Sequence, residues 1–516
     1  MARTVNLDAM IPRADLCEID TETGSAEKIS SLPLSQLTQD SFLVPSLRKP
    51  DFQRETNQWT PDQLLTFLKS YLDNELIPSL ILWRSPGRVF VIDGAHRASA
   101  LMAWIRDDYG DGVLSKKFYN NKISNEQIKV AETVRKKIQQ EVGSYNQLHA
   151  AIMNPSLIED DVLRIRADNA KIRSLALQWV EGTPQKAETS FFKINSQGTP
   201  LHKIEEKLLK NRKTPLAIAT RSVVRSGTGH KYWSSFPGDQ KEKIEELSAE
   251  LHSLLFSPEL EHPIKTLNLP HAGRVSPLPA YELMMAFFEA NETSVKDGPL
   301  LIDDPDGKNT TKTLLNAIQT TKRITGTHPS SLGLHPAVYF YNEHGKHVDT
   351  IFLAFIKAFS NAIRNNNSTF FEKFTQRRSL IEEIFLENKP LLNQANQAIH
   401  SGHRVKRWTD ALEKLVSGDL ALEKFDQQQL LDTLGLKGKI IAADVKEIGE
   451  NFSDGTKSAV FLNESIKGAL KCPLCKGYID MDKAGSYDHI IGKASGGKGN
   501  YENLQITHPY CNSIKN

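Results

Sequence analysis

Four potential metal ligands form two pairs near the end of the sequence. Cys472 and Cys475 are separated by two residues, and His508 and Cys511 repeat that spacing. Thiolate and imidazole groups in two such pairs can surround a tetrahedral metal ion, and zinc is the usual occupant. A redox Cys-x-x-Cys pair or a chance spacing is the alternative, but a redox pair needs no distant histidine and cysteine. The pattern therefore favours a closed structural zinc site.

Another set of polar residues lies among these pairs. Asp488 and His489 follow a segment predicted to form a short strand, and a Ser-Gly-Gly loop comes after them at 495–497. Asn503 and the terminal segment are expected to form a short helix that carries Asn512. A carboxylate and an amide oxygen can share a hard cation such as Mg²⁺, which leaves an imidazole beside it to activate water. This combination suits hydrolysis of a phosphodiester, because the metal stabilises charge on the phosphate and the leaving oxygen.

The stretch that contains both sets resembles the HNH endonucleases of the ββα-metal class, in their zinc-clipped form. The resemblance implies that Asp488 and Asn512 are the ligands of a catalytic Mg²⁺ or Mn²⁺ ion. It implies that His489 is the general base and that Asn503 orients the loop and the base.

One position departs from the usual zinc clip. The third ligand of the clip is normally cysteine, and here it is His508. Because histidine is a good zinc ligand, we expect the clip to persist. A degenerate zinc ribbon without catalysis is the alternative, and it is disfavoured because every expected position is filled in order.

Composition limits the class of protein. The chain has 516 residues, too many for one compact domain, so about three are expected. With 39% hydrophobic and 24% charged residues it is typical of soluble globular proteins. No apolar run approaches the roughly 18 residues of a membrane span, and the N-terminus lacks a signal peptide's apolar region. Three of the four cysteines belong to the clip, leaving Cys17, which favours a reducing cytoplasm.

Net charge gives no global sign of nucleic-acid binding. The balance is only +2, so affinity for DNA must come from local patches. The C-terminal stretch supplies one such patch, although a solvated lysine-rich surface is the alternative. Its members are Lys467, Lys471, Lys476, Lys493, Lys498 and Lys515.

The N-terminal part contains a second candidate site. Thr60, Pro61 and Gln63 form a helix start with a capping box. Two strand-like runs, 79–83 and 89–92, then lead into a short polar turn and another helix. Free N–H groups at such a helix start favour an anion, and an arginine adds a phosphate fork. The alternative is a helix start with a salt-bridging arginine. The turn comprises Asp93, Gly94, Ala95, His96 and Arg97.

Three blocks resemble the N-terminal domain of GmrSD-type restriction proteins, which belongs to the ParB/sulfiredoxin-like superfamily. They span about residues 40 to 215 and include the turn, the Gln53-Arg54 pair and the Phe191–Leu201 block. The resemblance implies an α/β domain that binds or hydrolyses a nucleotide, or senses modified DNA. Ala95-His96 replaces the more usual Gln-Gln, so nucleotide hydrolysis stays open. A domain that once bound phosphate and now only packs is the alternative. The implied nucleotide or phosphate site comprises Gln53, Arg54, Asp93, Gly94, His96, Arg97 and Asn195.

The middle of the chain carries no motif. Runs at 283–287 and 351–359 predict buried helices, which suit DNA grip or dimerisation. The histidines of this region, His335, His344 and His347, are expected at the surface or as caps.

We therefore predict a multidomain α+β protein: an N-terminal arm (1–30), a ParB/sulfiredoxin-like α/β domain (31–225), a helical middle (226–445) and a ββα-metal HNH domain (446–516). The predicted function is metal-dependent cleavage of invading phage DNA in the cytoplasm, with the N-terminal domain sensing nucleotide or modified DNA. Two alternatives stay open: a nucleotide-responsive DNA-binding regulator with a vestigial nuclease, and an RNase or toxin nuclease. The sequence also leaves open NTP binding, NTPase activity and a homo-oligomer; a membrane partner is not expected.

Overall fold

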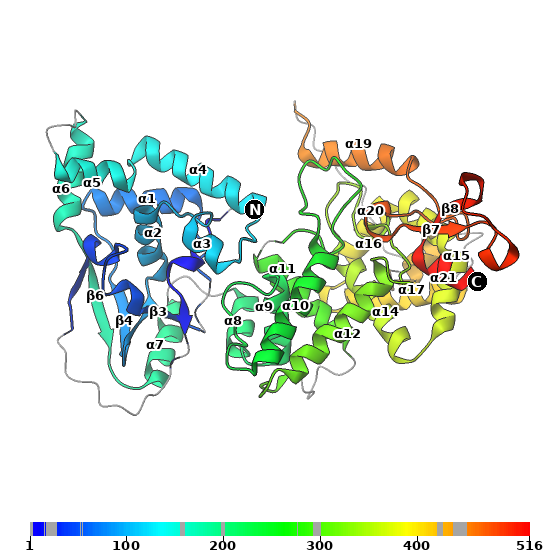
Figure 1. The fold of residues 1–516 in the computed structure, drawn as a ribbon, viewed down its shortest axis with the longest axis horizontal. Coiled ribbons are helices and arrows are strands. Elements are labelled where there is room, and N and C mark those ends of the chain that lie inside the picture. The colour runs from blue at the N-terminus through cyan, green and yellow to red at the C-terminus, as the bar shows by residue number, and fades with distance from the viewer. Residues whose placement is uncertain are drawn as a thin grey trace. The chain divides into compact units, whose positions relative to one another are not determined.

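The structure is a computed structural model that describes residues 4–14, 16, 28–51, 53, 55–154, 160–197, 202–275, 277–292, 301–419, 427–436 and 451–515, without the side chains of 195–197 and 277. The chain forms two compact units (Figure 1). The first comprises residues 1–212 and 228–232, and the second comprises 213–227 and 233–516. The predicted boundary between residues 445 and 446 lies outside the described residues, and the parts before and after it belong to the same unit.

A six-stranded mixed sheet organises the first unit, in the order β1-β3-β5-β4-β6-β2. The β4/β5 pair is an antiparallel hairpin, and β3 and β6 pair in parallel with its two outer edges. The predicted hairpin is therefore the centre of the sheet. The strands are β1 (Arg13–Ala14), β2 (Ser31–Pro33), β3 (Leu47–Pro50), β4 (Leu80–Ser85), β5 (Arg88–Asp93) and β6 (Ser174–Val180).

Two apolar clusters show that the sheet of the first unit is covered on both faces. The larger one joins the sheet to helices α1, α2, α4, α5 and α6, and the smaller one packs Trp83, Phe90 and Ile92 against Phe191 and Leu209. The helices are α1 (Pro61–Leu72), α2 (Ala95–Arg106), α3 (Val113–Phe118), α4 (Asn125–Glu141), α5 (Tyr145–Met153), α6 (Asp161–Ile172), α7 (Pro184–Gln197) and α8 (Lys203–Lys210).

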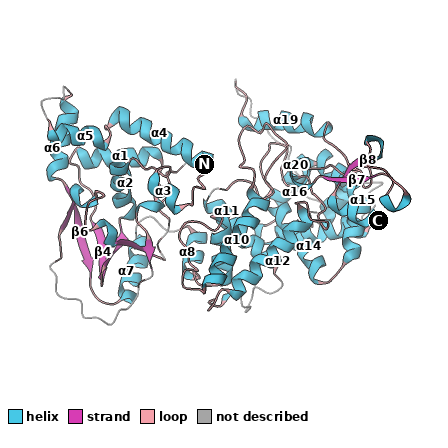
Figure 2. Cartoon of the chain, in the orientation of Figure 1, coloured by secondary structure: helices cyan, strands magenta, loops and turns pink. Residues whose placement is uncertain are grey.

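The second unit is helical except for one small hairpin in its described part (Figure 2). Its core is rich in phenylalanine: Tyr339 and Phe340 pack against rings of α14 and α15. The helices are α9 (Pro215–Val224), α10 (Gly238–Phe256), α11 (Pro277–Asn291), α12 (Lys308–Ile324), α13 (Pro336–Tyr339), α14 (Asp349–Arg364), α15 (Ser368–Glu387), α16 (Lys389–Ala398), α17 (Arg404–Ser417), α18 (Gln427–Thr433), α19 (Asp454–Lys467), α20 (Met481–Ala484) and α21 (Pro509–Lys515).

The hairpin of the second unit pairs β7 (Ser486–His489) with β8 (Leu504–Thr507) in antiparallel register. The Asp488-His489 pair was predicted to follow a short strand, and it instead forms the last two residues of β7. The helix predicted from Asn503 onward is wrong in its first half, because Leu504 begins β8 and the helix starts only at Pro509. None of the helices in the described ranges combines the length and the apolar character that crossing a membrane requires.

Candidate metal centre and active site

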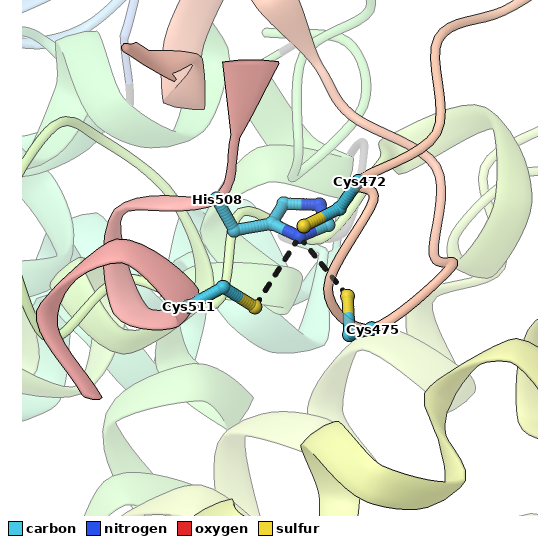
Figure 3. Close-up of side chains that lie close together, drawn as sticks. All are labelled: Cys472, Cys475, His508 and Cys511. Atoms are coloured by element: carbon cyan, nitrogen blue, oxygen red, sulfur yellow. Dashed lines mark hydrogen bonds between the residues drawn. The ribbon is translucent and has the colours of Figure 1, made fainter. Parts of the chain in front are cut away.

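The four predicted metal ligands converge in the second unit. Cys472 and Cys475 come from a tight turn after α19, and His508 and Cys511 come from the end of β8 and from α21 (Figure 3). All four are buried, and their ligand atoms lie within 4.8 Å of one another. Among the described residues, these form the one such group of histidine, cysteine and acidic side chains. The cluster can therefore hold a metal ion such as zinc.

Hydrogen bonding fixes the orientation of the His508 ring. Nε2 lies 2.9 Å from the carbonyl oxygen of Tyr478, which can only accept, so Nε2 carries the proton. The bare Nδ1 then faces the sulfur atoms, 3.3 Å from Cys475 and 3.8 Å from Cys511. Burial also lowers the pKa of His508, which keeps the ring neutral. A neutral imidazole held by a backbone carbonyl is the usual form of a metal-binding histidine.

A buried ion pair from α15 supports the turn that carries the first two cysteines. Arg378, which is fully buried, donates to Glu382 and to the carbonyl oxygens of Leu332, Gly333 and Tyr478. Glu382 in turn accepts from the backbone N–H of Tyr478 at 2.7 Å. The backbone of the cysteine turn is thus bonded to a helix about one hundred residues earlier in the chain. Sequence reasoning did not identify this pair.

The hairpin places the Asp488 and His489 side chains in different surroundings. Asp488 is 6% exposed, and its Oδ2 accepts from Gln505 Nε2 at 2.6 Å across the hairpin. His489, at the end of β7, is half-buried, and no hydrogen bond to its imidazole is recorded in the part of the chain that the structure describes. Because side chains alternate along a strand, burial of Asp488 is compatible with an accessible ring at the next position.

Asn503 closes the loop that follows β7. Its Oδ1 accepts from the backbone N–H of Ile491 at 2.7 Å, and its Nδ2 donates to the carbonyl oxygens of Ile491 and Lys498. A Cβ on Gly497 would collide with the backbone of Ile491, so the loop passes close to the strand end at that glycine. These bonds hold the chain on the C-terminal side of His489.

Helix α21 brings two residues back to β7. Asn512 donates through Nδ2 to Ser486 Oγ at 2.9 Å and to the carbonyl oxygen of Tyr487. Lys515 donates to Asp488 Oδ2 at 2.9 Å and to the carbonyl oxygens of His489 and Ile490. The structure therefore places the predicted residues along one hairpin: Asn512 is bonded at the start of β7, and Asn503 is bonded beyond its end. It adds Gln505, which follows only from the strand register, and it bonds Lys515, predicted as part of the C-terminal lysine patch, to Asp488.

The predicted N-terminal site lies where β5 meets α2. Gly94 adopts φ +91°, which permits the sharp turn before the helix. Arg97 Nη2 is bonded to Asp93 at 2.9 Å and to the carbonyl oxygen of Ser79 at 3.0 Å, whereas the buried Nε has no partner among the described residues. His96 stacks on Trp59, with ring centroids 5.5 Å apart. Arg54 and the side chain of Asn195 lie outside the described residues.

A buried charge cluster lies next to Gln53 in the first unit. Asp8 accepts from Arg13 and from Lys49, and Arg13 Nε donates to the carbonyl oxygen of Gln53. Burial would raise the pKa of Asp8, but the two cations outweigh it and hold that pKa well below its usual range. Gln53 is 6% exposed; Nε2 donates to Ile92, whereas Oε1 has no partner among the described residues. Sequence reasoning missed this cluster because its members come from three short segments.

Comparison with known proteins agrees with this geometry. Residues 34–213 match the model of the GmrSD restriction endonuclease N-terminal domain, and residues 472–516 match the model of the HNH endonucleases. No curated protein and no solved structure matches the chain. The first match covers strands β3, β4, β5 and β6 of the mixed sheet, and the second covers the metal-ligand cluster with the β7–β8 hairpin. The chain therefore joins an N-terminal domain of the GmrSD restriction endonuclease family to a C-terminal domain of the HNH family, and it is a nuclease that hydrolyses phosphodiester bonds.

Proposed function

We propose that the chain is a metal-dependent DNA endonuclease that restricts invading phage DNA in the cytoplasm. The C-terminal domain cuts, and the N-terminal domain controls cutting by sensing a nucleotide or modified DNA. The observation that carries the catalytic part is the accessible imidazole of His489 next to the buried carboxylate of Asp488, on a strand beside the four-ligand cluster.

Two metal sites fit the residues present. Three sulfurs and one imidazole nitrogen in a closed, buried group suit a structural zinc ion. Among the described residues, none donates a hydrogen bond to Oδ1 of Asp488 or of Asn512, and oxygen is the ligand that Mg²⁺ and Mn²⁺ prefer. A divalent ion bound there supplies positive charge against the phosphate and the leaving oxygen.

The chain's own residues supply the proton transfer. The His489 ring accepts a proton from the attacking water through whichever nitrogen faces it, since no described residue bonds either nitrogen. Asn503 keeps the loop after His489 in place through three hydrogen bonds to backbone groups. Asn512, tied to Ser486, fixes the helix end against the strand.

The N-terminal site supports a sensing role through polar groups without internal partners. Gln53 Oε1 is one such acceptor, and it lies beside the end of β5. The start of α2 at Ala95 presents the positive end of a helix dipole, which favours a phosphate. Arg97 Nη2 is already bonded to Asp93 and Ser79. We therefore propose that the backbone at the start of α2, more than the Arg97 side chain, binds an anion here.

The catalytic assignment is tested by cleavage of DNA with Mg²⁺, with Mn²⁺ and with a chelator. His489→Ala is expected to lower the rate by about 10²–10⁴-fold, the usual effect of removing a positioned base. His344→Ala, at an exposed histidine of the same unit, is the matched control and should cut normally. Undiminished cleavage by His489→Ala would overturn the assignment, and preferential cleavage of RNA offered in parallel would favour an RNase.

The sensing role has its own test. Phage DNA with and without modified bases is offered to the wild-type chain, in the presence and absence of nucleotide. We expect the cleavage rate to depend on the modification or on the nucleotide. Equal rates in all four reactions would contradict a sensing role for the N-terminal domain, while leaving the nuclease assignment intact.

A further inference from the structure

The ammonium group of Lys515 is bound by three oxygen atoms from consecutive residues. Nζ contacts Oδ2 of Asp488 at 2.9 Å and the carbonyl oxygens of His489 and Ile490. A lysine ammonium has three N–H donors, so these contacts use all of them. The side chain is 24% exposed, while the Asp488 side chain is 6% exposed. The charge is therefore held at the edge of the site, with solvent on one side.

The three acceptors form a cation cradle. One carboxylate and two backbone carbonyls are the oxygen types that bind divalent hard cations in proteins. Oδ2 of Asp488 has a second donor, the neutral amide of Gln505 at 2.6 Å, and Oδ1 has no donor among the described residues. The cradle therefore does not need the ammonium to stay oriented, whereas a second cation on the same carboxylate would be repelled by it.

We propose that Lys515 is a displaceable internal cation that competes with the divalent ion for Asp488. This inference rests on the proposed function, because it concerns the metal site on which cleavage is expected to depend. Two states of the side chain follow. In the closed state the ammonium is bonded to Asp488 and neutralises it; in the open state the flexible side chain has swung away and the ammonium is in solvent. The protein therefore holds its carboxylate site ready without a bound divalent ion, and it weakens the apparent affinity for that ion.

The size of the effect follows from the open population. If the open state accounts for roughly 1–10% of molecules, the apparent affinity is lowered by about 10- to 100-fold. Removing the ammonium removes that reduction. The Lys515→Met and Lys515→Gln variants should therefore bind Mn²⁺ at least about tenfold more tightly than the wild type. Lys515→Arg keeps the charge and should not bind Mn²⁺ more tightly.

The test measures Mn²⁺ binding directly by electron paramagnetic resonance, on full-length protein whose zinc content has been checked. Lys493→Met is the matched control, because Lys493 is an exposed lysine in the adjoining loop with no recorded side-chain bond among the described residues. If general charge alone mattered, both lysine-to-methionine variants would bind more tightly by similar factors. We expect the gain for Lys515→Met alone.

The remaining outcomes are decisive as well. Unchanged or weaker Mn²⁺ binding by both neutral variants overturns the proposal, and so does loss of folding in both, because the ammonium would then be structural. Asp488→Asn separates this failure from failure of the proposed function. If that variant binds Mn²⁺ as the wild type does, the metal is not at Asp488, and the site assignment itself is wrong.

Discussion

Individual residues in the hairpin region differ in how far the protein itself occupies their polar groups. The ring of His489 is half-buried, whereas Asn503 is 8% exposed and its amide forms three hydrogen bonds to backbone groups. The same sequence motif thus contains one half-buried imidazole and one amide that is bonded within the protein. Motif matching names both residues, and only the hydrogen bonds separate their tasks.

Replacement of Asn503 should loosen the loop after β7. Asn503→Ala leaves the N–H of Ile491 without its side-chain partner, and loss of one such hydrogen bond costs about 0.5–1.5 kcal/mol locally. We expect faster hydrogen exchange at Ile491 and a lower cleavage rate, with zinc content unchanged. Asn500→Ala, at an exposed neighbouring asparagine, is the control. Wild-type exchange in Asn503→Ala would show that the loop is held by other contacts.

Sequence patterns predicted residue types at this scale better than their surroundings. The spacing of the cysteines and of His508 was sufficient to predict their convergence, because few other arrangements bring four such ligands together. His335 was expected at the surface or as a cap; it occupies the N-cap position of α13, but it is 2% exposed and makes no side-chain cap hydrogen bond. A single histidine in a mixed sequence carries no sign of its burial, which depends on helices distant in the sequence.

Elements follow the local sequence wherever local forces suffice. The predicted capping box is present, with Thr60 and Gln63 bonded to each other's backbone at the start of α1. The stretch from Leu504 to Thr507 became a strand instead of a helix because it pairs with β7 over four residues. Such pairing is a tertiary preference, and it overrides weak local propensity.

The connection between α15 and the cysteine turn yields a prediction at the scale of elements. Glu382→Gln removes the charge opposite the buried Arg378, and breaking one partner of a buried pair costs about 3–5 kcal/mol. Glu383→Gln changes the exposed neighbour and should stay within about 0.5 kcal/mol of the wild type. Denaturant unfolding of zinc-loaded protein measures both. Equal stabilities would mean that the pair does not hold the turn.

At the scale of the whole molecule, three domains were predicted and the chain divides into two compact units. The nuclease motif and the helices before it share one unit through polar contacts that a single sequence does not reveal. Tyr510 N–H donates to Ser331, and Ile264 N–H donates to Ser458. These bonds join segments far apart in the chain, so no composition change marks them.

The stability of the second unit should depend on pH through two buried groups of opposite effect. Burial, followed by the charge of Lys389, lowers the pKa of His335 to about 3, so the unfolded state alone gains a proton as pH falls below 6.5. Burial raises the pKa of Asp480 to about 6, so the folded state gains a proton first. Between pH 7.5 and 5, His335 should remove about 2 kcal/mol of stability and Asp480 should restore about 1 kcal/mol.

Variants separate these two contributions. His335→Leu should lose less stability than the wild type between pH 7.5 and 5, and Asp480→Asn should lose more. Calorimetry measures the stability of both variants through the unfolding transition that responds to zinc. Acid release of zinc should affect the wild type and both variants alike, so it does not alter the comparison. If the three curves are parallel over this range, neither group titrates on unfolding as its burial implies.

The buried Arg378–Glu382 pair also determines how portable the nuclease is. Grafting residues 472–516 onto another DNA-binding protein would transplant the cluster without the side chains that bond Tyr478 on both its N–H and its carbonyl. A functional transplant would have to include α15 and the Leu332–Gly333 segment, or replace them with a designed helix that offers the same donor and acceptor. Transfer of the nuclease domain to another protein would therefore require transfer of its helical support as well.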